Sequence, residues 1–326
     1  MGITLHNFIH LNYAFRAKGF SGLIKERSCM KLNSLKPIFV TSFLLTLSGA
    51  SLAEGLEKNK VGISGNISVV SAYVNRGMTN DLENDSATIQ TALKFNYNQF
   101  YFTYFNSKLG YSFNEIQNEE DRYKKAELNV NNRLNSEISE EEYAKEVEKE
   151  YNHLGLTSKR ASSFSFYEND FILGYESNYK NLNYDVNLKY FYYAESENTG
   201  GLEAGIAFKY PLREDKDKLG LSIETYLNDV YFMNKGDTYV EFNYENVLAP
   251  TYYLNLYAGF SYFNENGKYV KNSTEDFTFR HATFEVAHSL DQNEQVFGWM
   301  QYVIGGKDRY SDHQKNMVVA GLSYNF

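Results

Sequence analysis

Long segments of this sequence alternate between apolar and polar residues, and this alternation limits the folds open to the chain. One segment alternates without a break: Leu182, Asn183, Tyr184, Asp185, Val186, Asn187, Leu188, Lys189 and Tyr190. Comparable segments begin at Ile89, Leu219, Val240 and Leu254. Because successive side chains of a strand point to opposite faces, a period of two predicts β-strands with one apolar and one polar face.

The length of the segments distinguishes a soluble sheet from a membrane barrel. Strands of soluble sheets average about 5–6 residues, whereas a tilted strand that crosses a bilayer needs about 9–11. The segments here run to roughly 10–14 residues, and many end in Tyr or Phe, as the aromatic girdles of membrane barrels do. We expect twelve strands, with ten or fourteen as alternatives, over residues 62–75, 86–97, 100–112, 164–178, 181–193, 201–210, 218–231, 237–248, 251–263, 277–289, 295–304 and 314–326.

The connections between these segments support the same fold. They are short after the even-numbered segments and mostly longer after the odd-numbered ones, which is the asymmetry of outer-membrane barrels. Pro211 and Pro250 both fall in expected short turns. The prediction is an all-β fold, an antiparallel up-and-down transmembrane β-barrel. The barrel should be closed, because an open sheet edge in lipid leaves backbone groups unsatisfied.

Composition excludes several other classes of protein. No run reaches about 18 apolar residues, which excludes a helical membrane protein. The net charge of -9 argues against a nucleic-acid partner. The sequence has no P-loop, G-x-S-x-G, H-E-x-x-H or dinucleotide-binding fingerprint, so we expect no enzymatic activity and no cofactor.

Residues 30–53 have the pattern of a secretory signal peptide. A basic start precedes a short apolar centre over residues 38–47, and Ser51 and Ala53 stand at -3 and -1 of a predicted cleavage site. The sole cysteine, Cys29, lies upstream of this site, so the exported chain should have no disulfide.

Met30 is a second possible translation start, and residues 1–29 precede it. We interpret them as an over-extended gene start, or alternatively as an unusually long basic region of the signal. Residues 1–53 are therefore assigned to targeting and residues 54–326 to the barrel. Loss of residues 1–53 removes six Lys/Arg and one Asp/Glu, which leaves a net charge of -14.

The C-terminal segment ends on an aromatic residue. Val318, Ala320, Leu322, Tyr324 and Phe326 share one face. A terminal aromatic that closes an alternating strand resembles the recognition signal of bacterial outer-membrane barrels. We therefore assign Tyr324 and Phe326 to an assembly signal and expect three partners: the barrel-assembly machinery, outer-membrane lipid and lipopolysaccharide.

The first predicted strand and its loop read GNISVVSAYVNRGMTND over residues 65–81. They resemble the start of the TorF family of porins (the Gcw_chp family), whose recurrent element is similar to S-x-Y-V-x-R-G. The matching residues are Ser71, Tyr73, Val74, Arg76 and Gly77, while Ala72 replaces the aspartate that is common before the tyrosine. The resemblance implies an outer-membrane barrel with a pore, and it implies no particular substrate.

The polar strand faces should surround the lumen and carry more acidic than basic groups, which would favour cations. The expected pore-lining residues are Arg76, Lys94, Asp185, Lys189, Glu203, Glu224, Glu241, Glu245 and Glu285. The expected function is a small passive diffusion channel for ions or small hydrophilic solutes, with a weak cation preference. Two alternatives stay open: the charges pair across the lumen and plug it, or a non-conducting structural or surface-interaction barrel acts through its external insert.

Arg76 and Gly77 occupy the outer end of the first predicted strand. Arg76 could form a constriction that contacts anions, or it could make a salt bridge that fixes the loop; Gly77 should permit a turn. The following loop carries Asp81, Glu83 and Asp85, which could bind Ca²⁺ or bridge lipopolysaccharide, but their spacing favours a solvated acidic loop and no metal site.

An external acidic insert spans residues 114–163, with 12 acidic and 8 basic residues. Ser139 and Glu142 form a capping box, and one amphipathic helix should follow, with an apolar stripe at Ala144, Val147, Tyr151 and Leu154. The insert could gate the mouth or contact a partner, although a mobile solvated loop is the favoured interpretation. His288 and Ser289 resemble a fragment of an outer-membrane lipase, but neighbours on a strand point apart.

Overall fold

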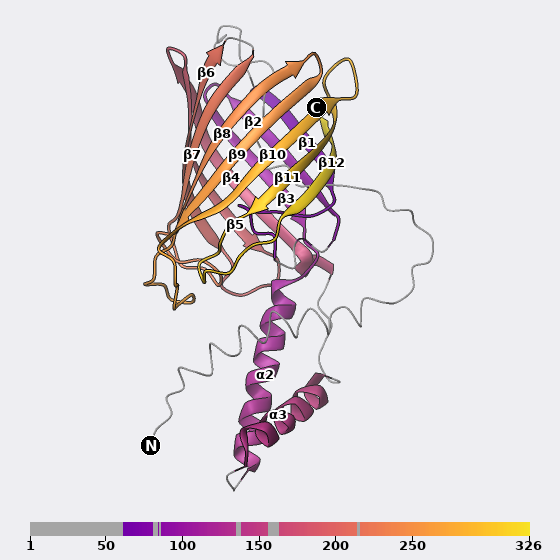
Figure 1. Ribbon diagram of the computed structural model, residues 1–326, viewed down its shortest axis with the longest axis vertical. Coiled ribbons are helices and arrows are strands. Elements are labelled where there is room, and N and C mark those ends of the chain that lie inside the picture. The colour runs from indigo at the N-terminus through magenta and orange to yellow at the C-terminus, as the bar shows by residue number, and fades with distance from the viewer. Residues whose placement is uncertain (1–60, 81–83, 85, 135–137, 156–162, 214–215) are drawn as a thin grey trace, which may run out of the picture. The chain divides into compact units, whose positions relative to one another are not determined.

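The computed structural model describes residues 61–80, 84, 86–134, 138–155, 163–213 and 216–326. The signal peptide, the start at Met30 and the residues Asp81, Glu83 and Asp85 lie outside the described residues. Within the described part of the chain, twelve antiparallel strands form a closed barrel, which confirms the predicted fold (Figure 1). The strands are β1 (Val61–Val70), β2 (Thr88–Tyr97), β3 (Phe100–Lys108), β4 (Tyr167–Tyr179), β5 (Leu182–Tyr193), β6 (Gly201–Arg213), β7 (Asp217–Tyr226), β8 (Thr238–Ala249), β9 (Tyr252–Tyr262), β10 (Phe277–Ser289), β11 (Val296–Gly305) and β12 (Met317–Asn325).

Each strand pairs with its neighbours in sequence, and the pairing of β1 with β12 closes the barrel. Gly65 and Phe326 exchange two backbone hydrogen bonds there, with N···O distances of 2.8 and 3.0 Å. The connections after β2, β4, β6, β8 and β10 are short and share one barrel end with the C-terminus, the upper end in Figure 1. Closure therefore leaves none of the described strands with an edge exposed to lipid.

The two faces of the sheet differ in chemistry as the alternation predicts. The exposed outer face carries large apolar side chains, among them Ile63, Ile67, Ile89, Leu173, Val186, Leu188, Phe242, Phe284, Val286, Met300, Val318 and Leu322. The buried inner face carries polar ones, among them Ser68, Gln90, Thr103, Ser107, Glu203, Thr283, Glu285, Gln301 and Ser323. An apolar outside with a polar inside is the arrangement of transmembrane β-barrels, the reverse of a soluble globule.

Several strands end earlier than the sequence predicts, because their last residues leave the sheet to pack inside the mouth. The prediction extends the first strand to residue 75, but β1 ends at Val70 and the chain turns inward. Tyr73, Leu109 and Val230 follow β1, β3 and β7, and they share one buried apolar cluster with Phe191 and Tyr226. Alternation continues past these strand ends, so the sequence pattern alone overestimates their length.

The expected turn position of Pro211 is also wrong. Pro211 lies within β6 and pairs with Lys218, beside a register shift between Pro211 and Arg213. A bulge near a strand end is a place where the missing N–H of proline is tolerated. Pro250 does lie in a turn, directly after β8.

The external insert is a helical hairpin. It contains α2 (Phe113–Arg133) and α3 (Glu140–Gly155), so the expectation of one helix is wrong. The helices share a core of Ala126, Val130 and Val147, with Tyr123, Leu134, Tyr143, Tyr151 and Leu154 packed around it. The capping box is confirmed, since the Glu142 backbone N–H donates to Ser139 Oγ and the Ser139 N–H donates to the Glu142 carboxylate, each at 3.3 Å.

Ala144 is exposed and does not belong to the predicted stripe. Sequence analysis missed α2 because its polar residues dominate, and Ala126 and Val130 become a recognisable face only when α3 lies against them. None of the described helices combines the length and the apolar character needed to cross a lipid bilayer.

Candidate functional site in the barrel interior

Residues 71–80, which we call the inward loop, fold from the end of β1 into the barrel. Ala72, Tyr73 and Val74 are buried, and a turn follows in which the Met78 N–H donates to the Asn75 carbonyl at 2.9 Å. Arg76 and Gly77 adopt left-handed backbone conformations, with φ of 48° and 73°. Gly77 has a second reason to lack a side chain, because a Cβ there would lie 2.5 Å from atoms of His281.

Arg76 crosses the interior and binds the opposite wall. Its guanidinium donates to both carboxylate oxygens of Glu203 on β6, at 2.8 and 3.0 Å, and it also pairs with Glu224 on β7. It donates to the Tyr226 hydroxyl at 3.2 Å. Since β1 is bonded only to β2 and β12 in the ladder, β6 and β7 are the far side of the barrel. The inward loop therefore spans the lumen.

Glu203 also receives a second cation. Lys189 on β5 lies 2.5 Å from Glu203 Oε2, so one carboxylate with a side chain only 2% exposed is shared by two positive groups. We call Arg76, Lys189, Glu203 and Glu224 the paired side of the interior. Bidentate arginine–carboxylate geometry of this kind is the strong form of an ion pair.

The far end of the inward loop is tied to the connection between β11 and β12. The backbone N–H groups of Thr79 and Asn80 donate to Gln314 Oε1 at 2.9 and 3.1 Å. Asn80 also donates to the His313 carbonyl at 2.7 Å and accepts from the Lys315 N–H at 3.0 Å. With Arg76 held at one wall and Asn80 at the other, the loop is fixed at both ends.

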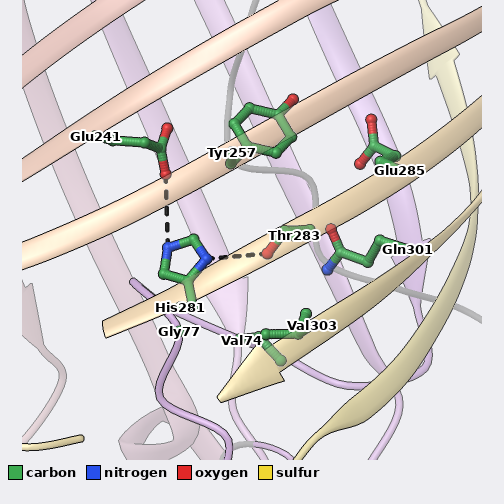
Figure 2. Close-up of a pocket in the computed structure, with 9 residues that line it drawn as sticks. All are labelled: Val74, Gly77, Glu241, Tyr257, His281, Thr283, Glu285, Gln301 and Val303. Carbon is green, nitrogen blue, oxygen red and sulfur yellow. Dashed lines mark hydrogen bonds and ion pairs between the residues drawn. The ribbon is translucent and has the colours of Figure 1, made fainter. Parts of the chain in front are cut away.

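The other part of the interior, on β8 to β11, contains a pocket. It is lined by Glu241, His281, Glu285 and Gln301, which we call the pocket side, and by Val74, Gly77, Tyr257, Thr283 and Val303. Figure 2 shows Glu241 and His281 on one side of the pocket and Glu285 with Gln301 on the other. The inward loop contributes Val74 and Gly77 to this lining, and the Arg76 guanidinium lies 5.3 Å from the ring of Tyr239, which donates to Glu241.

His281 faces the interior on the same strand parity as Thr283 and Glu285, and an irregularity beside it also brings Arg280 inside. The register of β10 shifts between Phe279 and His281, so the consecutive residues Arg280 and His281 are both buried. His281 Nε2 lies 2.6 Å from the Tyr239 hydroxyl, which donates to Glu241 at 2.7 Å, and His281 Nδ1 lies 2.9 Å from Thr283 Oγ1. Sequence reasoning missed Gln301 and Tyr239, although both stand on the polar parity of their strands.

The remaining predicted lumen residues form separate contacts. Lys94 pairs with Glu176, Lys209 lies 2.7 Å from Glu245, and Asp185 accepts from Asn187 at 2.6 Å. The structure thus brings Arg76, Lys189, Glu203 and Glu224 into contact, while Glu241 and Glu285 line opposite sides of one pocket. It leaves Lys94, Asp185 and Glu245 in other contacts.

The outer mouth is ordered by ion pairs between loops. Arg309, between β11 and β12, binds Asp237, which precedes β8. Glu275, which precedes β10, accepts from Lys307 Nζ at 2.8 Å and from Ser311 Oγ at 2.7 Å. Both of these contacts lower the pKa of Glu275, the Lys307 contact more than the Ser311 contact.

His288 and Ser289 do not form a nucleophile and base pair in their described contacts. His288 Nδ1 lies 3.1 Å from the Thr251 carbonyl oxygen, and its ring stacks on Tyr252 at 4.1 Å between centroids. Ser289 Oγ donates to the Asp291 carbonyl at 2.9 Å. In these contacts each side chain meets a backbone carbonyl oxygen and not the other side chain. This agrees with strand geometry, in which neighbouring residues point to opposite faces.

The chain resembles solved barrel structures only distantly. The KdgM porin has a TM-score of 0.45 at 5% identity, over 81% of this chain and 99% of that one. The NanC porin has a TM-score of 0.42 at 6% identity, over 81% and 99%. Outer membrane phospholipase A from Escherichia coli has a TM-score of 0.39 at 8% identity, over 80% and 89%. No family model and no curated protein matches the chain.

These likenesses carry no argument, and the class of the protein rests on its own geometry. A closed antiparallel barrel with an apolar outer face, a polar interior and short turns at one end is the outer-membrane type of β-barrel. The protein is therefore a bacterial outer-membrane β-barrel.

Proposed function

We propose that the protein is a passive diffusion channel of the outer membrane for ions and small hydrophilic solutes, with a weak preference for cations. The polar inner face supports a water-filled interior, and the inward loop supports a narrow one. The single observation that carries the proposal is the path of Arg76, whose guanidinium is bound by Glu203 and Glu224 on the far wall. The loop thereby occupies one part of the lumen and leaves another part lined by polar side chains.

The arrangement of charge supports the cation preference. The basic groups Arg76, Lys189 and Lys209 are each held by carboxylates. Glu241 and Glu285 on the pocket side have no lysine or arginine partner among the described residues. Negative groups without a cationic partner raise the local concentration of cations in a low-dielectric passage.

Three predictions from the sequence accompany this proposal. The resemblance of residues 65–81 to the TorF family of porins agrees with a pore. Tyr324 and Phe326 stay our prediction for an assembly signal; both rings are exposed and their centroids are 6.0 Å apart. Outer-membrane lipid contacts the apolar face, while lipopolysaccharide and the barrel-assembly machinery are proposed partners.

Recording of single channels in planar bilayers tests the proposal. We expect stepwise conductance from the folded barrel and a reversal potential of the sign that cation preference gives in a salt gradient. Absence of conductance from protein that migrates as a folded barrel would rule out the channel. A reversal potential of the opposite sign would remove the cation preference alone.

A second function has an observation in its favour. The helices α2 and α3 share a buried core, so the insert is a folded hairpin that can present a defined surface to a partner. Its base is part of the mouth, because Asn114 and Gln117 donate to the carbonyls of Glu195 and Glu197, each at 2.6 Å. Deletion of residues 118–160 therefore leaves the base intact. A channel should keep or gain conductance after this deletion, whereas an interaction barrel should lose its partner.

A further inference from the structure

We propose that the outer face of the barrel holds a binding site for one phospholipid, with an acyl chain in a groove along β7 and the phosphate at Arg213. The site lies at the barrel end with the short turns, which is the periplasmic end of an outer-membrane barrel. It does not depend on the proposed channel, because its residues face away from the lumen.

An apolar groove with a volume of about 290 Å³ forms the first part of the site. The register places Leu221 between Phe208 on β6 and Phe242 on β8, and it places Leu219 beside Tyr210. The rings of β6 and β8 therefore stand on both sides of the leucines of β7. Since a water molecule takes up about 30 Å³ in the liquid and a methylene group is of similar size, the groove has room for a stretch of one acyl chain.

A bulge in β6 turns Arg213 to the same outer face. Pro211 pairs with Lys218 on β7, and the next pair in the ladder is Arg213 with Asp217. One residue of β6, Leu212, therefore has no counterpart on β7. Without this extra residue Arg213 would share the inward parity of Pro211, whereas the bulge gives it the outward parity of Asp217 and of the groove leucines. Re-aiming a side chain in this way is a common role of bulges.

Asp217 fixes the Arg213 guanidinium at the head of the groove. Both carboxylate oxygens of Asp217 accept from Arg213 Nε at 3.0 Å, and the Tyr244 hydroxyl on β8 donates to Oδ2 at 3.1 Å. The Asp217 side chain is 4% exposed, but that of Arg213 is 56% exposed. A guanidinium has five N–H donors. Held by one edge, it can donate from its exposed part to an anion at the membrane surface.

The groove and the arginine together fit a phospholipid. Asp217 and Leu219 are successive outward residues of β7, which strand geometry places about 7 Å apart, so the arginine stands directly at the groove's end. A phospholipid joins a phosphate to an acyl chain, and arginine binds phosphate through paired N–H donors. The exposed guanidinium also favours a lipid over a second copy of the barrel, because charged residues are depleted from the centre of protein interfaces.

Native mass spectrometry of the purified barrel in detergent tests the site. The probe is palmitoyl-oleoyl phosphatidylglycerol, and the diacylglycerol with the same chains is the reference without phosphate. We expect one phosphatidylglycerol to bind about tenfold more tightly than diacylglycerol. Arg213→Gln should remove this difference. Leu221→Trp fills the groove and should weaken the binding of both lipids several-fold while Arg213 stays in place.

Two matched controls make the same changes elsewhere. Arg133→Gln alters an arginine of the hairpin whose side chain is 51% exposed and paired with Glu146. Leu322→Trp alters an exposed leucine on the outer face of β12, near the same barrel end. We expect both control variants to bind the two lipids as the wild type does.

The outcomes separate a defined site from general contact with lipid. Equal binding of the two lipids by the wild type would overturn the phosphate contact and with it the site. Unchanged binding in Leu221→Trp, or an equal loss in Leu322→Trp, would show that lipid has no defined position on the barrel. A lipid-free dimer that Leu221→Trp dissociates would place a second copy of the chain in the groove. Conductance enters none of these outcomes, so the site and the channel can fail separately.

Discussion

The two sides of the interior carry similar numbers of carboxylates but use them differently. On the paired side, Glu203 lies between Arg76 and Lys189. On the pocket side, Glu285 is also buried. Its described contact is a hydrogen bond that it accepts from the uncharged amide of Asn255. The first carboxylate fixes the inward loop, and the second has no lysine or arginine partner among its described contacts.

This comparison teaches that a count of charges on the inner face does not describe a lumen. An excess of acidic over basic residues suggests a general preference for cations. The structure shows that some acidic groups neutralise the loop, whereas Glu241 and Glu285 have no lysine or arginine partner among the described residues. Substitutions that are chemically identical should therefore have opposite consequences on the two sides.

The largest expected effect comes from Glu203→Gln. Loss of this carboxylate leaves Arg76 and Lys189 buried without their shared anion, and removal of one partner from a buried ion pair costs about 3–5 kcal/mol. Glu285→Gln removes no ion pair, so we expect it to change the free energy of unfolding by less than about 1 kcal/mol, or to raise it. Denaturant unfolding of the two variants in detergent measures both values. Similar destabilisation in the two variants would contradict the distinction between the sides.

The second effect concerns the path through the barrel. Arg76→Gln should release the inward loop from Glu203 and Glu224, and we expect the single-channel conductance to rise several-fold. It should also strengthen the cation preference, because Glu224 loses its cationic partner and Glu203 keeps only Lys189. Arg133→Gln is a suitable control, since Arg133 pairs with Glu146 on the exposed hairpin. A conductance equal to that of the wild type would show that the loop does not narrow the passage.

A smaller effect is expected at Gly77, in the turn of the inward loop that borders the pocket. Gly77 has φ of 73°, and a side chain there would meet His281. Gly77→Ala adds about 1–2 kcal/mol of backbone strain from the left-handed conformation alone. We expect a lower free energy of unfolding together with a shifted His281 ring, which NMR of labelled histidine can follow. A variant as stable as the wild type, with an unshifted ring, would mean that the loop does not pack against β10.

The fold was predictable because the alternation of apolar and polar residues can be recognised within each strand by itself. Leu182 to Tyr190 alternate in the sequence and face alternately out and in along β5, since the two-residue period follows from strand geometry alone. The connections and the closing C-terminal strand were predictable for the same reason. A bulge breaks the rule, and the shift between Phe279 and His281 therefore places Arg280 in the interior although its parity differs from that of Glu285.

The site was predictable only in part. Parity along the strands indicated Glu203, Glu224, Glu241 and Glu285, and the resemblance drew attention to Arg76. Which of these residues meet depends on the path of residues 71–80, and that path is determined by partners more than a hundred residues away. Gln301 was not singled out because a lone amide on a polar strand face is common.

The smallest effect is expected at Asp291, a carboxylate that lies outside the membrane-spanning strands, unlike the interior carboxylates. Asp291, in the turn between β10 and β11, accepts from the backbone N–H groups of Val296, Gln295 and Asn293 at 2.7, 2.8 and 3.1 Å. These bonds, that from Val296 most of all, lower its pKa. A lowered pKa in the folded state means that ionised Asp291 stabilises the turn above its unfolded pKa. This stabilisation is lost as pH falls through the folded pKa.

We expect Asp291→Asn to lower Tm slightly at neutral pH, with a difference that narrows below about pH 4 and then disappears. Glu148→Gln on the exposed face of α3 controls for loss of a surface charge. A Tm difference that persists at low pH would show that the backbone donors bind the protonated and ionised forms of Asp291 equally well. The charge of Asp291, unlike that of Glu203, would then contribute nothing to stability.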